Sequence, residues 1–134
     1  MDAEIADYIA SVILLAKATF HSVQHSTDST PKRSILRLEA GYGSYRVLVT
    51  ELFSDNRRRK YRYYLLQDNY VEAGFDNSPD PRAIRLKYGS IGQAHVGELI
   101  PHLHQVDKTE LTLTDEIVFQ AFVQWLQENY PTPS

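Results

Sequence analysis

The sequence from Arg58 to Phe75 decides the fold and reads RRKYRYYLLQDNYVEAGF. Its first half alternates with a period of two, which lets a strand present different residues to its two faces. One face of this predicted strand carries Tyr61, Tyr63 and Leu65, and the other carries Lys60, Arg62, Tyr64 and Leu66. Asp68 and Asn69 both tolerate positive φ, so they predict a tight turn into a second, antiparallel strand. One face of that returning strand carries Val71, Ala73 and Phe75.

The flanking sequence extends this hairpin into a larger sheet. Residues 35–40 and 45–53 are rich in β-branched and aromatic residues and predict two strands before the hairpin. Prolines in residues 76–81 end the hairpin, because proline lacks the donor that a central strand needs. We expect residues 83–88 to form a further edge strand and residues 89–110 to form a long loop with one short element.

Two amphipathic helices are predicted near the ends of the chain. Apolar residues recur at helical spacing from residue 3 to about residue 24. Towards the other end, Thr114 is a suitable N-cap, with Asp115 and Glu116 in the first turn. The expected fold is therefore a single α+β domain over residues 1–134, with an N-terminal helix, an antiparallel meander of four to five strands, and a C-terminal helix packed on the sheet.

The composition excludes several classes of protein. The chain has 134 residues, of which 43% are hydrophobic and 23% charged, as in ordinary globular domains. It has no cysteine, which excludes disulfides and cysteine-based metal sites and suits a cytoplasmic protein. The first residues match neither a signal peptide nor a membrane span. The net charge of -3 gives no global attraction for nucleic acid, so a site for a polyanion has to be local.

Asp76 is a first candidate for a functional residue, in the segment Asp76-Asn77-Ser78-Pro79. Loops at strand ends present polar side chains from a rigid scaffold, and binding residues are common there. The same residue types also form ordinary turns, in which a side chain bonds a nearby backbone N–H group. The sequence leaves both interpretations open.

His102 and His104 form a second candidate. Two histidines at positions i and i+2 face the same way if the segment is extended. Histidine titrates near neutral pH, so such a pair can act as acid and base. A metal would need a third ligand from Asp76, Asp80 or His95. We predict neither a metal nor a cofactor, although the sequence leaves open a metal bound by the two histidines and a carboxylate. Two surface histidines in a loop are the simpler alternative.

Basic residues gather in the middle of the chain, where several alternate with tyrosines. Arginine pairs with phosphate and aromatic rings stack on bases, so these residues are candidates for binding nucleic acid. The candidates are Arg58, Lys60, Arg62, Tyr64, Arg82 and Arg85. The alternative is a charged sheet edge that discourages pairing with other chains.

Three segments follow one another in an order that matches a known pattern. They are Tyr61-Arg62-Tyr63-Tyr64, Phe75-Asp76-Asn77-Ser78-Pro79 and Pro101-His102-Leu103-His104. Together they resemble the TumE family of small bacterial and archaeal proteins, the toxin components of type II toxin–antitoxin modules. The resemblance covers residues 35 to 128. It implies a toxin that acts on RNA or translation, and a cognate antitoxin, with a DNA-binding helix-turn-helix, that neutralises it.

Two functions are consistent with these features. In the first, the chain is a small, metal-independent ribonuclease in which His102 or His104 is the general base or acid and Asp76 orients a histidine or takes a proton. The cations available to stabilise charge on phosphate are Arg62, Arg82 and Lys108. In the second, the chain is a non-enzymatic module that binds a protein or a nucleic acid. We expect no membrane partner, and the sequence leaves the choice between a monomer and a homo-oligomer open.

Overall fold

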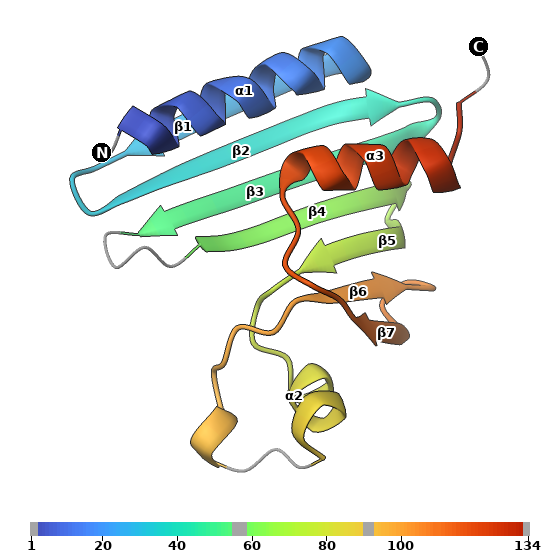
Figure 1. Cartoon of the computed structure of the whole chain (residues 1–134). Helices are drawn as coiled ribbons and strands as arrows, with labels where there is room; N and C mark the ends of the chain where they lie inside the picture. Colours follow the sequence, from blue (N-terminus) through green and yellow to red (C-terminus); the bar gives the residue numbers. More distant parts are fainter. Residues whose placement is uncertain (1–2, 55–58, 90–92, 133–134) are drawn as a thin grey trace.

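The computed structural model describes residues 3–54, 59–89 and 93–132. Within these residues one antiparallel sheet contains seven strands, each paired with its neighbour in the sequence (Figure 1). The strands are β1 His21–Ser29, β2 Arg33–Tyr42, β3 Tyr45–Ser54, β4 Arg59–Gln67, β5 Tyr70–Asp76, β6 His102–Gln105 and β7 Glu110–Leu113. The predicted α+β class and antiparallel meander are confirmed, although the sheet has more strands than the four to five expected.

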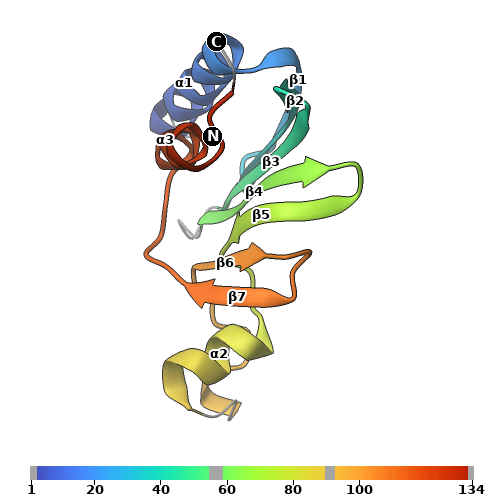
Figure 2. The ribbon, with the colours of Figure 1, turned by 90° about the vertical axis from the view of Figure 1, so that its right-hand side faces the viewer.

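The two long helices cover one face of the sheet. α1 (Ala3–Thr19) and α3 (Phe119–Asn129) both lie on this face (Figure 2). The strands contribute every second residue to the core beneath them, including Leu36, Leu38, Ala40, Val47, Val49, Tyr61, Tyr63 and Leu65. The predicted alternation of β4 is therefore confirmed, and its other face is left for the opposite, open side of the sheet.

The open face carries a small apolar cluster of its own, made of Tyr64, Leu66 and Val71. Val71 was predicted to share a face with Ala73 and Phe75, and this prediction is wrong. The pairing of β4 with β5 shifts, so that Leu65 opposes Ala73 but Leu66 opposes Val71. The unpaired residue Glu72 forms a β-bulge, which shifts the alternation of side chains along β5, so that Val71 lies on the opposite face from Ala73.

The N-terminal helix is shorter than predicted, because it ends at Thr19 and the chain continues as β1. Apolar residues after Thr19, such as Phe20 and Val23, still pack on the core. They therefore fit a helical spacing without being helical. Antiparallel pairing with β2 satisfies the backbone of residues 21–29, so the tertiary context overrides the local pattern.

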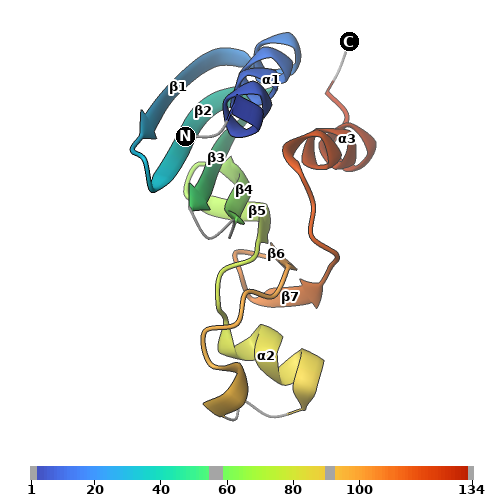
Figure 3. The ribbon, with the colours of Figure 1, turned by 60° about the vertical axis from the view of Figure 1, so that its left-hand side comes forward.

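Residues 83–88 form a helix and not the predicted edge strand. This helix, α2 (Pro81–Tyr88), starts at the N-cap Asp80, whose side chain accepts a 2.8 Å hydrogen bond from Arg82 N. Proline at the first helical position and a left-handed glycine, Gly89, at the end are regular start and stop signals. Figures 1 and 3 show α2 beyond β7, at the far end of the strand order from β1. Its apolar side packs in the cluster Ala83, Ile84 and Ile100.

Residues 89–110 contain more structure than the predicted loop, namely a 3₁₀ turn η1 (Gln93–His95) and the strand β6. The start of the last helix was also predicted too early. Thr114 N donates to Pro101 O at 3.1 Å, so Thr114 still lies beside β6, and α3 begins after the N-cap Val118. No helix in the described part of the chain is long and apolar enough to cross a membrane.

A buried ion pair links the helices to the sheet. Glu51 of β3 is fully buried and lies 2.7 Å from Nη2 of Arg59 of β4. The hydroxyl of Tyr8 in α1 donates to Glu51 at 2.9 Å, and Arg59 donates to Ile117 O, just before α3, at 3.0 Å. The pair therefore joins the neighbouring strands β3 and β4 to α1 and to the segment before α3, and Arg59 serves the core, not a nucleic-acid surface.

Candidate functional site

Asp76 lies at the end of β5, opposite Arg62 of β4 and His102 of β6. Its carboxylate is buried, and Oδ1 accepts a hydrogen bond from Ser78 N at 2.5 Å. Oδ2 accepts one from the hydroxyl of Tyr64 at 3.2 Å and lies 3.5 Å from Nε of Arg62. Burial raises the pKa of Asp76, but the hydrogen bonds from Ser78 and the charge of Arg62 lower it by more. The net pKa is below its usual value, and the side chain is a carboxylate at neutral pH.

The segment after Asp76 is both a turn and part of the site. The bond from Ser78 N to Asp76 is the side-chain turn that the sequence suggested as an alternative. Asn77 has a structural role, because its Oδ1 accepts from Tyr61 N at 3.0 Å and its Nδ2 donates to Arg59 O at 2.9 Å. The turn thereby positions Asp76 at the end of the sheet.

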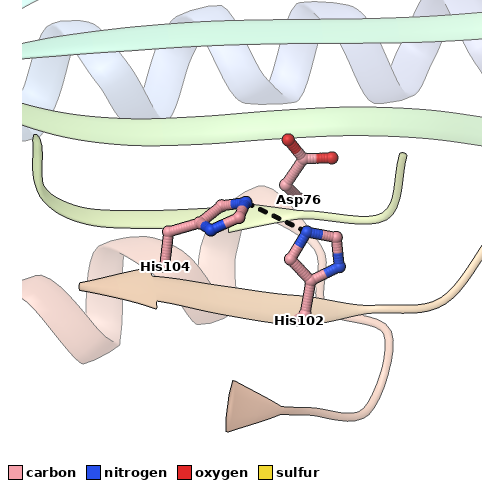
Figure 4. Close-up of side chains that lie close together, drawn as sticks. All are labelled: Asp76, His102 and His104. Carbon is pink, nitrogen blue, oxygen red and sulfur yellow. Dashed lines mark hydrogen bonds between the residues drawn. The ribbon is translucent and has the colours of Figure 1, made fainter. Parts of the chain in front are cut away.

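His102 and His104 lie in β6, where alternate residues share a face. They are buried, with exposed fractions of 1% and 4%, so they are not surface histidines of a loop. Their Nε2 atoms are 3.1 Å apart, and Figure 4 shows the two rings pointing towards each other beside the carboxylate of Asp76. Burial, followed by the charge of His102, lowers the pKa of His104 to about 4, which leaves it neutral near pH 7.

The hydrogen bonds of the two rings restrict their tautomers. Nδ1 of His102 is 2.7 Å from Ile100 O, and a carbonyl can only accept, so this nitrogen carries hydrogen. When His102 is neutral, its Nε2 therefore carries no hydrogen, and the lone pair on this atom faces Nε2 of His104. Nδ1 of His104 is buried with no hydrogen-bond partner among the described residues. A buried polar atom without a hydrogen-bond partner lowers the stability of the folded chain by about 1–3 kcal/mol, so this ring orientation has an energetic cost.

Asp76, His102 and His104 form a compact set, which we call the His–Asp cluster. One atom from each side chain, a nitrogen or a carboxylate oxygen, lies within 4.8 Å of the other two. Of the three residues predicted as a third ligand, Asp76 is the one that joins the histidines. His95 stacks on Tyr88 with 3.5 Å between ring centroids, outside this set.

Three cations surround the cluster. The guanidinium of Arg62 and Nζ of Lys108 lie 5.3 and 5.0 Å from the ring centroid of Tyr64. The third cation, Arg82 of α2, donates from Nη1 to Lys108 O at 2.7 Å and from Nη2 to Asp80 at 3.2 Å. The helix α2, absent from the sequence prediction, therefore positions one of the cations.

The turn between β6 and β7 places Lys108 in an unusual backbone conformation. Val106, Asp107 and Lys108 have φ of 50°, 52° and 69°. Non-glycine residues in this region cost on the order of 1–3 kcal/mol each and are frequent at functional sites. Two bonds to β5 support the turn, from Asp107 N to Val71 O at 2.9 Å and from Val71 N to Asp107 Oδ1 at 3.1 Å. These two bonds hold the turn in its strained conformation, in which Nζ of Lys108 lies 5.0 Å from the ring centroid of Tyr64.

These side chains line a single hollow of about 220 Å³, which we call the cationic pocket. Its lining consists of Arg62, Tyr64, Asp76, Ser78, Pro79, Asp80, Arg82, His102, His104 and Lys108. All four predicted catalytic residues are among them, together with three of the predicted nucleic-acid-binding residues, Arg62, Tyr64 and Arg82. Three basic and two acidic side chains leave an excess of one positive charge.

The other three predicted nucleic-acid-binding residues do not line this pocket. Lys60 borders a neighbouring hollow with Thr50 and Leu52. Arg85 is exposed on α2, and Arg58 lies outside the described residues. The basic strand is therefore divided, with Arg62 and Tyr64 at the pocket and Lys60 beyond its edge.

Gly74 is a residue of the site that the sequence analysis missed. It lies in β5 opposite Tyr64 of β4 and His104 of β6. A Cβ atom at this position would lie 2.6 Å from the ring of Tyr64, so only glycine lets that ring cross the strand. The sequence does contain a signal for this role, because an isolated glycine inside a predicted strand often marks a place where another group approaches the backbone closely.

Comparisons with protein-family models, with curated proteins and with solved structures find no match for this chain.

Proposed function

We propose that this protein is a small RNA-cleaving enzyme and the toxin component of a type II toxin–antitoxin module. The observation that carries the proposal is the cationic pocket, in which three basic side chains from separate elements surround a buried histidine pair and a carboxylate. Lysine and arginine bind phosphate, and histidine exchanges protons near neutral pH. The combination fits a reaction at a phosphodiester.

The size of the pocket favours a phosphodiester of a polymer over a free metabolite. Pockets for small molecules and cofactors usually measure about 300–1,000 Å³, and the cationic pocket measures about 220 Å³. It has room for a phosphate and part of its sugar, while the remainder of a nucleic acid would lie across the open face. The ring of Tyr64 is buried and lies close to the charged groups of Arg62 and Lys108, so its part in binding is to support these two cations and not to stack on a base.

The arrangement assigns different tasks to the pocket residues. The three cations hold the phosphate and stabilise the charge that develops on it during the reaction. The His–Asp cluster is the reaction centre: a neutral histidine takes the proton of the RNA 2′-hydroxyl, the 2′-oxygen forms a bond to the adjacent phosphorus, and the bond from phosphorus to the 5′-oxygen breaks as that oxygen takes up a proton. Tyr64 is not a base, since burial and the charge of Asp76 raise its pKa above the usual value and keep its hydroxyl protonated.

The toxin assignment is supported by where the family-like segments lie. Each of the three segments that resemble TumE proteins supplies at least one lining residue: Arg62 and Tyr64 from the first, Asp76 from the second, and His102 and His104 from the third. Segments that resemble a family in sequence and meet in one pocket are more informative than the same segments apart. As a toxin the protein would act in the cytoplasm, and its partner would be an antitoxin with a DNA-binding helix-turn-helix.

Expression in a bacterial host tests the toxin assignment. We expect the wild-type chain to arrest growth, and we expect co-expression of the neighbouring antitoxin gene to relieve the arrest. The double variant His102→Ala/His104→Ala should permit growth at the same expression level, because the reaction centre is lost. Normal growth with soluble wild-type protein, or equal arrest by the folded double variant, would contradict the assignment.

A further inference from the structure

We infer that Asp76, His102 and His104 bind one divalent transition-metal ion of the zinc class at the floor of the cationic pocket. The use of the ion in catalysis rests on the proposed function, but its binding does not. The inference replaces the metal-independent mechanism expected from the sequence.

The spacing of the donor atoms suits such an ion. Zinc lies about 2.0–2.1 Å from nitrogen and oxygen ligands, so neighbouring donors in a tetrahedral site are about 3.4 Å apart. The two Nε2 atoms are 3.1 Å apart, and a carboxylate oxygen lies within 4.8 Å of both histidines. A closing movement of Asp76 by about 1.5 Å at most would therefore complete a three-ligand set.

The residues around the cluster hold two of the ligands in the required orientation. His102 donates from Nδ1 to Ile100 O, which directs a lone pair on Nε2 into the cluster. Ser78 N and the hydroxyl of Tyr64 bond the carboxylate of Asp76, which retains capacity for a further partner. Hydrogen bonds of this kind, outside the ligands themselves, are a regular property of metal sites.

His104 provides a second, independent observation. It is 4% exposed, its Nε2 faces another histidine, and its Nδ1 has no partner in the described part of the chain. A buried polar group that remains unsatisfied needs a specific reason. An ion at Nε2 would be such a reason, because a metal–ligand bond at this atom can outweigh the unpartnered Nδ1, whereas without an ion the ring gains only the 3.1 Å hydrogen bond between the two Nε2 atoms.

The ligand types select the class of ion. Two imidazoles and one carboxylate suit Zn²⁺ and related transition metals, whereas Mg²⁺ and Ca²⁺ prefer oxygen ligands alone. Three protein ligands are characteristic of catalytic zinc sites, which leave a position open for water or substrate. That position would face Arg62, Arg82 and Lys108, which line the same pocket. The ion would polarise the phosphate that these cations hold.

Calorimetric titration of the EDTA-treated full chain with ZnCl₂ tests the inference. We expect one equivalent of zinc to bind, and we expect His102→Gln, His104→Gln and Asp76→Asn each to weaken binding by about 100-fold or more, since loss of an outer-shell partner alone costs 10–100-fold. His25→Gln removes an exposed histidine of β1 and should leave the affinity unchanged. Equal zinc affinity in the wild type and the folded cluster variants would overturn the inference.

X-ray absorption at the zinc edge provides a measurement that needs no variant. The zinc-loaded wild-type chain should show the multiple-scattering signature of two imidazole rings, together with directly bound oxygen ligands. Fewer than two imidazoles, or no stoichiometric zinc in the folded chain, would overturn the site. MgCl₂ in the same titration is expected to give no binding at micromolar concentrations.

The outcome also separates this inference from the proposed function. Zinc that binds to the cluster of a chain that cleaves no RNA would keep the site and remove the function. RNA cleavage that is unchanged after EDTA treatment, in a chain that binds no zinc, would keep the function and remove the site.

Discussion

The double variant His102→Ala/His104→Ala is expected to cleave RNA about 10³-fold more slowly than the wild-type chain, a loss of about 4 kcal/mol of transition-state stabilisation. The two rings are the reacting groups of the cationic pocket, either as ligands of an ion or as proton acceptors. The surrounding cations would remain, so RNA should still bind. Single-turnover cleavage of an end-labelled RNA, with binding measured separately by anisotropy, checks both parts.

The matched control is His25→Ala/His95→Ala, which removes two histidines that do not line the pocket. This control should cleave at the wild-type rate, and circular dichroism should show that both double variants are folded. A folded His102→Ala/His104→Ala chain that cleaves as fast as the wild type would exclude the histidine pair from the reaction. A wild-type chain that binds RNA without cutting it would favour the non-enzymatic binding module.

Glu51→Ala is expected to lower the free energy of unfolding by about 3–5 kcal/mol, the usual cost of removing one partner of a buried ion pair. Arg59 would be left at the base of the helices with its main counter-charge gone, and Tyr8 would lose its acceptor. Such a loss is a large part of the stability of an ordinary domain. Urea unfolding followed by circular dichroism gives the comparison.

Glu39→Ala is the control for this measurement. Glu39 pairs with Arg46 at 3.7 Å on the surface, where both side chains are about half exposed, and its loss should change stability by no more than about 0.5 kcal/mol. If Glu51→Ala were as mild as Glu39→Ala, the buried pair would not be a main link between helices and sheet. Glu51→Gln, which keeps the shape and part of the hydrogen bonding, should lie between the two.

The hairpin at the centre of the fold was predictable because its determinants are local. Alternation in β4 and the turn at Asp68 and Asn69 depend on residues within a few positions of one another. The bulge that reverses Val71 was not predictable, because a bulge depends on the pairing of two strands. The helix α2 differs from the predicted edge strand although Asp80 and Pro81 are regular start signals, because the same prolines also end the strand before them.

The candidate site was predicted as separate parts and not as an assembly. Asp76, His102 and the basic residues were identified from their chemistry. Their convergence depends on β6, which returns to pair with β5 so that Asp76 opposes His102. Nothing within the local sequence of residues 101–104 distinguishes that strand from a loop. Gly74, which makes room for Tyr64, gains its meaning only once both neighbouring strands are in place.

Binding of nucleic acid at the cationic pocket, beside the His–Asp cluster, is the first requirement of the proposed function. Its most direct test is a titration of the chain with a single-stranded DNA oligonucleotide, which lacks the 2′-hydroxyl and is not cut, followed by NMR of the histidine rings. The resonances of His102 and His104 are expected to shift while that of His25, which lines another hollow over β1–β3, does not. Shifts of His25 alone, or no shifts at all, would contradict it.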